Sequence, residues 1–192
     1  MTTYSVIPRL LEDRVDRELE AGERVMWIDM PIPRYFTRTS TAAFLFAIPW
    51  TAFALFWIIG AAGFKVPDFS EGGDSLFPLF GMPFVLIGVG LLSTPLWAYR
   101  KALKTVYVIT DRRAITFESG RSTTIRSYPP EKLKDVYRKE KRDGSGDVII
   151  SHRAWRDSDG HKQSEELGFL NVRNPREIEQ MLKQLAGKSS AQ

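Results

Sequence analysis

Ser40–Phe64 reads STAAFLFAIPWTAFALFWIIGAAGF and Ser75–Tyr99 reads SLFPLFGMPFVLIGVGLLSTPLWAY, and neither stretch contains a charged residue. Each stretch would form roughly 37 Å of helix, whereas a bilayer core of about 30 Å needs only about 20 apolar residues. Two buried helices of a soluble protein would need a surrounding shell, and too few residues remain to build one. The sequence therefore predicts a two-helix transmembrane hairpin, with helices over 40–64 and 75–99.

Basic residues flank the outer ends of the two apolar stretches, whereas the loop between them, residues 65–74, holds one Lys and three acidic residues. Lys and Arg near the ends of a span mark the cytoplasmic side, so we expect both termini in the cytoplasm and the loop outside it. Trp and Tyr favour the membrane–water interface. The predicted membrane-interface anchors are Arg34, Arg38, Trp97, Tyr99, Arg100, Lys101 and Lys104.

The segment before the first apolar stretch predicts one helix and one strand. Residues 1–22 are expected to form an amphipathic helix that ends at Gly22, with Leu10, Leu11, Val15 and Leu19 on its apolar face. The segment 23–31 is rich in large and β-branched residues and is closed by prolines, which is typical of a strand.

Short strands separated by turns are predicted after Lys104. Consecutive strands joined by short turns pair antiparallel, so with segment 23–31 the chain would have seven antiparallel strands able to curl into a barrel. Asn174 and Pro175 predict the start of a final helix, Gly187 its end, and residues 188–192 a disordered tail. The six strands expected after Lys104 are 105–110, 113–118, 122–128, 136–141, 148–155 and 163–172.

Four short motifs occur in order along this region, and a fifth lies near the N-terminus. They are Tyr107–Ile115 (YVITDRRAI), Asp143–Ile149 (DGSGDVI), Gly168-Phe169, Asn174–Glu179 (NPREIE) and Gly22–Trp27 (GERVMW). In these motifs the chain resembles the bacterial pleckstrin-homology (PH)-like membrane proteins.

The resemblance implies an α+β membrane protein of the bacterial cytoplasmic (inner) membrane. Seven strands would close as two near-orthogonal sheets with a C-terminal helix, and the transmembrane hairpin would be inserted between the first and second strands. The PH-like domain at 102–187 would lie in the cytoplasm. The family resembles binding or scaffold modules, so the resemblance implies no reaction.

Few residues in the chain suit catalysis or metal binding. There is no cysteine, which excludes disulfides, cysteine metal sites and a cysteine nucleophile. His152 and His161 are the only histidines, and Asp157, Asp159 and His161 could form either a cation site or a simple polar turn. No Ser–His–acid set is discernible, and neither apolar stretch carries an ionisable residue. We therefore predict a protein that is not an enzyme and has no metal or cofactor.

Positive charge is concentrated after the second apolar stretch, because residues 100–192 hold 20 Lys and Arg against 13 Asp and Glu. Solvated strand faces would give the same pattern, and Arg112 and Arg113 could face either acidic lipid heads or water. The densest cluster enters the turn at Asp143 and forms the candidate basic binding surface: Arg138, Lys139, Lys141 and Arg142.

The sequence thus predicts a binding or scaffold module that is anchored in the lipid bilayer and engages a protein partner or assembles as a homo-oligomer. Recognition of anionic phospholipid is the alternative, because each Lys or Arg near such a surface is attracted by about 1 kcal/mol. Nucleic acid is not an expected partner, since no recognition helix or aromatic platform accompanies the basic cluster.

Overall fold

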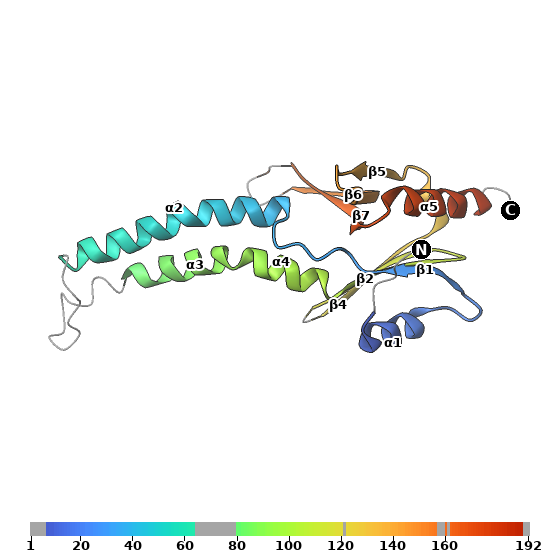
Figure 1. Cartoon of the computed structure of the whole chain (residues 1–192), viewed down its shortest axis with the longest axis horizontal. Helices are drawn as coiled ribbons and strands as arrows, with labels where there is room; N and C mark the ends of the chain where they lie inside the picture. Colours follow the sequence, from blue (N-terminus) through green and yellow to red (C-terminus); the bar gives the residue numbers. More distant parts are fainter. Residues whose placement is uncertain (1–6, 64–79, 121, 157–159, 161, 190–192) are drawn as a thin grey trace. The chain divides into compact units, whose positions relative to one another are not determined.

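A computed structural model describes residues 7–63, 80–120, 122–156, 160 and 162–189 (Figure 1). The chain divides into two compact units: a helical unit, residues 34–100, and a β unit, residues 1–33 and 101–192. The loop predicted at 65–74 and the cation site considered at Asp157, Asp159 and His161 lie outside the described residues.

Three helices form the helical unit. Helix α2 (Arg38–Ala61) begins with a capping box in which Thr37 and Ser40 exchange side-chain and backbone hydrogen bonds, and it continues through Pro49 without a break. Helices α3 (Met82–Leu92) and α4 (Thr94–Ala102) follow each other closely. By length and composition, Thr39–Ala61 and Met82–Ala102 could each cross a membrane.

The second span differs in its bounds from the predicted 75–99, since its helices extend to Ala102 and are interrupted at Ser93. The interruption lies two residues before Pro95, which has no N–H to donate to the carbonyl of Leu91. The hydroxyl of Thr94 donates to that carbonyl instead, at 2.7 Å. In an apolar environment, this hydroxyl donor keeps the Leu91 carbonyl hydrogen-bonded.

Small residues at seven-residue spacing form the seam between α2 and α3. Ala47 and Ala54 are buried on α2, and a side chain at Gly88 of α3 would meet the Oγ1 atom of Thr51 at 2.2 Å. This spacing is that of two helices wound in a left-handed pair, and small residues let their backbones approach closely. In the described part of the helical unit, the buried residues follow the same spacing: Ser40, Ala47 and Ala54, and then Gly81, Gly88 and Pro95.

Replacing Gly88 with leucine is expected to force α2 and α3 apart, because the new side chain has no space beside Thr51. Overpacking of this kind costs about 1 to 3 kcal/mol. Thermal unfolding of the detergent-solubilised protein would show a lower midpoint. Gly90→Leu is the matched control, because nothing lies within 4 Å of a Cβ at Gly90. Equal midpoints for the two variants would contradict the seam.

Two antiparallel sheets make up most of the β unit. The first has the order β1-β2-β3-β4 and the second β5-β6-β7. The seven predicted strands are therefore confirmed. The predicted closed barrel is not formed, because among the described residues no strand of one sheet is hydrogen-bonded to a strand of the other. The strands are β1 (Val25–Asp29), β2 (Thr105–Thr110), β3 (Ala114–Ser119), β4 (Thr123–Tyr128), β5 (Tyr137–Glu140), β6 (Gly146–Arg156) and β7 (Lys162–Val172).

The first sheet is covered on both faces. Tyr107 and Ile109 of β2 join the core that contains the second sheet and helix α5 (Pro175–Ser189). Val106 and Val108 face the other way and pack with Leu11 and Val15 of helix α1 (Arg9–Glu18). Strand β2 is therefore buried along its whole length, which explains its uninterrupted run of apolar and β-branched residues.

Three predictions about the terminal helices were wrong. Helix α1 ends at Glu18 and not at Gly22, because the chain is already extended at Leu19. Leu10 does not belong to the apolar face of α1: it is 72% exposed, because it lies on the flank of the helix beside Leu11 and Val15. Helix α5 does not end at Gly187, since Lys188 and Ser189 are helical and Gly187 has no positive φ angle. A glycine ends a helix readily only where it adopts the left-handed conformation.

Candidate functional site

The predicted basic surface lies on β5 and the turn that follows it, and three of its four cations have partners. The guanidinium of Arg138 binds Glu140 at 3.3 Å and also binds Glu179. The ammonium of Lys139 binds Glu166. These contacts neutralise much of the charge that the sequence places there, and the use of this surface in binding stays a prediction.

The remaining two cations of this surface are held differently. Lys141 Nζ donates to Asn171 Oδ1 at 2.7 Å, and Arg142 is exposed in the turn. Glu179 on α5 is the buried acid of the region, and hydrogen bonds from Lys183 and Arg138 lower its pKa. Its position shows that the sequence pattern located the cations but not the carboxylates that face them.

The predicted interface anchors lie at the ends of the apolar helices. Trp97 is 64% exposed, and the Tyr99 ring stacks on Tyr35 with a centroid separation of 4.3 Å. In the helical unit Arg34 is half-buried and Arg100 is exposed, and for Arg38 the structure describes only the backbone. In the β unit Lys101 Nζ lies 3.2 Å from Glu118 Oε2, and Lys104 is exposed.

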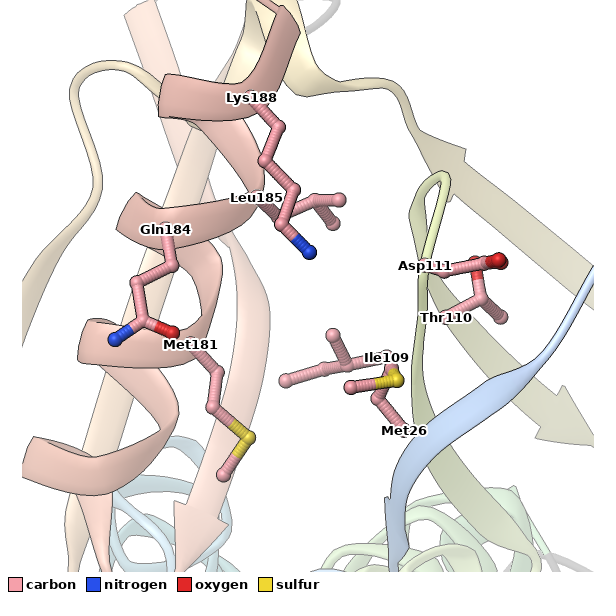
Figure 2. Close-up of a pocket in the computed structure, with 8 residues that line it drawn as sticks. All are labelled: Met26, Ile109, Thr110, Asp111, Met181, Gln184, Leu185 and Lys188. Atoms are coloured by element: carbon pink, nitrogen blue, oxygen red, sulfur yellow. The ribbon is translucent and has the colours of Figure 1, made fainter.

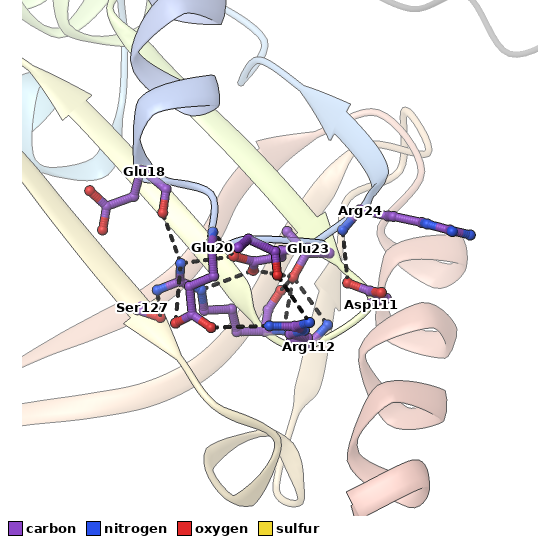
Figure 3. Close-up of polar contacts among 10 residues, drawn as sticks. Glu18, Glu20, Glu23, Arg24, Asp111, Arg112 and Ser127 are labelled. Carbon is purple, nitrogen blue, oxygen red and sulfur yellow. Dashed lines mark hydrogen bonds and ion pairs between the residues drawn. The ribbon is translucent and has the colours of Figure 1, made fainter.

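The Asp111-Arg112-Arg113 turn binds the segment that links α1 to β1 (Figure 3). Arg113 grips the Glu23 carboxylate with two hydrogen bonds of 2.9 Å, and the Thr110 hydroxyl donates to the same carboxylate at 2.7 Å. The Glu23 side chain is fully buried, and these contacts lower its pKa to about 2, with the Arg113 hydrogen bond as the main cause. The expectation that Arg113 faces lipid or water was therefore wrong.

The neighbouring side chains of this turn also face the linking segment. Arg112 pairs with Glu20 at 3.3 Å, and Asp111 Oδ1 accepts a hydrogen bond from the Arg24 amide at 2.9 Å. Arg113 also donates to the Glu18 carbonyl at 2.9 Å. The motif thus holds the N-terminal segment on the first sheet, which is a structural task rather than ligand binding.

Tyr107, at the start of the same motif, joins the two sheets. Its hydroxyl donates to the Leu170 carbonyl at 3.2 Å and accepts from the Leu170 amide at 3.1 Å. Its ring stacks on Phe169 with centroids 4.7 Å apart, and Phe169 stacks in turn on Trp27. Burial raises the pKa of the Tyr107 phenol, so this hydroxyl stays protonated and serves as a fixed link.

A pocket of about 90 Å³ lies between α5 and the paired ends of β1 and β2 (Figure 2). Ile109 and Leu185 are its buried apolar residues, and Met26 and Met181 line it from the strand and the helix. Polar groups complete the lining: Thr110, Asp111, Gln184 and Lys188. An apolar pocket with a polar margin suits a single apolar side chain of a partner.

Sequence reasoning missed this pocket. The register of β1 against β2 shifts between Val25 and Trp27, so Met26 has no partner in the ladder and is 62% exposed. The available signal was four consecutive apolar residues, Val25–Ile28, in a strand at the edge of a sheet, where strict alternation is expected. Elsewhere, no group of three His, Asp or Glu side chains in the described part of the chain is placed to hold a metal ion.

Comparison with known proteins supports one assignment. No curated protein and no solved structure gives a significant match to the sequence. The family model described as "Bacterial PH domain" matches residues 32–186, a range that begins after β1 and includes α2, α3 and α4. The Gly22–Trp27 motif lies before this range, whereas the other four motifs lie within it. Because the match covers well over half of its length, the chain belongs to the bacterial PH domain family.

Proposed function

We propose that this protein is a membrane-anchored binding module. The helical unit spans the bacterial cytoplasmic membrane as a hairpin, and the β unit binds a protein partner, or a second copy, in the cytoplasm. Membership of the PH family supports a binding role rather than catalysis. The observation that carries the proposal is the exposure of apolar side chains along the two long helices.

The outward faces of these helices consist of large apolar side chains. On α2, Phe53 is 67% and Phe56 is 65% exposed, and on α3 Leu86 is 66% exposed. In each candidate span 11% of the most apolar window is buried, whereas a core helix of a soluble protein would be mostly buried. Apolar surface of this extent is costly in water and favourable among lipid chains.

Topology is the first test of the proposal. Protease added to the outer face of intact spheroplasts is expected to leave the β unit uncut. Lys and Arg flank the outer ends of the spans, and such flanking cations stay on the cytoplasmic side. Protease added after lysis should then digest it. Cleavage of the β unit before lysis would overturn the topology.

The second test locates the surface that binds the partner. The two candidates are the Met26–Met181 pocket and the basic surface. We expect a double variant, Met26→Gln and Met181→Gln, to lose a cross-linked partner in the full-length protein in membranes, because polar side chains would spoil the apolar pocket. The comparison variant carries Lys139→Gln, Lys141→Gln and Arg142→Gln, and it retains Arg138 because Glu179 needs that partner. Loss of the cross-link in the comparison variant alone would show that the partner binds the basic surface and not the pocket.

A further inference from the structure

One end of the β unit carries both connections to the apolar hairpin. The chain leaves this unit at Pro33, soon after β1, and returns at Lys101, just before β2. The antiparallel pairing of Asp29 with Tyr107 brings these two connections to the same end of the first sheet. Thr105 pairs with Glu118, so the turn between β3 and β4 lies at this end as well.

Arg14, in the middle of α1, reaches the same end. The Ser119 amide donates to the Lys104 carbonyl at 2.8 Å, and the Arg14 guanidinium donates to the Ser119 hydroxyl and, at 2.7 Å, to the Thr123 hydroxyl. The last turn of α1 instead contacts Arg113, at the opposite end of the β2–β3 hairpin. Helix α1 therefore points its N-terminus toward the connections.

Exposed aliphatic side chains and cations both occur at this end, which we call the connection rim. Leu10 is 72% and Leu103 is 44% exposed. Leu10 and Arg14 lie one turn apart on one stripe of α1, which also carries Asp13, while Glu12 and Asp16 lie on the opposite flank. The cations at this end, Arg14, Lys101, Lys104 and Arg126, outnumber the acids Asp13 and Glu118, so its net charge is positive. The connection rim consists of Leu10, Arg14, Lys101, Leu103 and Lys104.

We propose that the connection rim rests on the anionic headgroups of the membrane, with Leu10 and Leu103 inserted among them. This inference rests on the proposed membrane anchor. Lys104 follows Trp97 by seven residues: the first five rise about 7.5 Å along α4 to Ala102, and the last two form a turn. The Debye length at physiological salt is about 8 Å. Aliphatic side chains next to Lys and Arg are the composition of surfaces that lie in the membrane interface. Helix α1 is thus a second, peripheral membrane contact of the β unit.

Single-cysteine variants test this contact directly, because the chain has no native cysteine. A nitroxide would be attached to full-length Leu10→Cys, Glu12→Cys, Ala21→Cys or Phe53→Cys protein in phosphatidylcholine vesicles with or without phosphatidylglycerol. Collisions with lipid-soluble oxygen and with a water-soluble nickel chelate are then compared. Glu12 is the control on the opposite flank of α1, and Ala21 is the control at the far end of the β unit. Phe53 reports on the anchor itself.

In vesicles with phosphatidylglycerol, labels at positions 10 and 53 are expected to favour oxygen, and labels at 12 and 21 to favour nickel. Replacing Lys104 with glutamine should weaken the contact at position 10 about fivefold, which is the share of one cation near an anionic surface. A label at position 10 that behaves like the one at 21, while 53 stays in lipid, overturns the rim and leaves the anchor intact. A label at 53 in water overturns the anchor. An unchanged result at position 10 in pure phosphatidylcholine overturns the dependence on headgroup charge.

Discussion

An Arg113→Met variant is expected to unfold with a free energy about 3 to 5 kcal/mol lower than that of the parent protein, because removing one partner of a buried ion pair leaves the other charge unpaired. Here the charge left behind is the Glu23 carboxylate, whose side chain is fully buried. Urea unfolding of the solubilised protein, followed by hydrogen exchange of β2 and β3, measures the change.

Arg112→Met is the matched control for this prediction. The Arg112–Glu20 pair is about half exposed on both sides, so its loss should cost less than about 1 kcal/mol. The double variant Arg113→Met, Glu23→Gln should recover part of the lost stability, since the glutamine amide leaves no buried charge. Similar small losses for Arg112→Met and Arg113→Met would show that the buried pair does not secure the N-terminal segment.

The same pair makes the stability of the β unit depend on pH in the acid range. The pKa of Glu23 falls from 4.5 to about 2 on folding, so its ionised form favours the folded state. The contribution, about 3 kcal/mol, is complete above about pH 5 and is lost as the pH falls toward 2. Urea midpoints measured between pH 7 and pH 2.5 should fall in the parent protein. In the Glu23→Gln variant this part of the fall should be missing.

Gly168→Ala is expected to prevent stable packing of the second sheet. Gly168 adopts a φ angle of +158°, and a Cβ there would lie 2.1 Å from the Val148 carbonyl oxygen and 2.9 Å from the Ile150 nitrogen. Both atoms belong to the backbone of β6, so no side-chain rotation relieves the contact. The adjacent Phe169 is buried in the stack with Tyr107, and displacement of β7 would disturb that core.

The expected loss for Gly168→Ala exceeds about 3 kcal/mol, at the upper end of overpacking costs. Gly187→Ala is the control, because Gly187 lies within α5 with nothing within 4 Å of a Cβ. Alanine there should stabilise the helix by about 0.5 to 1 kcal/mol. Thermal unfolding of both variants decides the matter, and a Gly168→Ala protein as stable as its parent would refute the steric argument.

Local patterns predicted most of the secondary structure. The charge-free runs indicated two long apolar helices, and the turn residues separated seven strands in the observed order. Closure of the sheets was not predictable in this way, because hydrogen bonding between β4 and β5 depends on where the chain after Pro129 turns. Local periodicity has no information about that path.

Long-range contacts explain the rest of the difference. Glu23 and Arg113 lie 90 residues apart, so no local pattern pairs them. From the sequence alone, Arg113 was therefore expected to face lipid or water. The cations of β5 were located correctly, but Glu166 and Glu179 come from other elements. The pocket depends on a bulge at Met26 and on α5, and the apolar run in β1 signals the bulge but not the helix that faces it.

The helical unit is inserted in the sequence between β1 and β2, and this order has a consequence for biosynthesis. Strand β1 leaves the ribosome before either apolar helix, and β2, its neighbour in the sheet among the described residues, follows both of them. At 5 to 20 residues per second, β1 waits roughly 4 to 15 s for its partner. If a single helix crossed the bilayer, β1 and β2 would emerge on opposite sides and the first sheet could not form. If the helices span a membrane as proposed, the first sheet can form only after both have crossed, and a chain with faulty topology would stay unfolded and open to proteolysis.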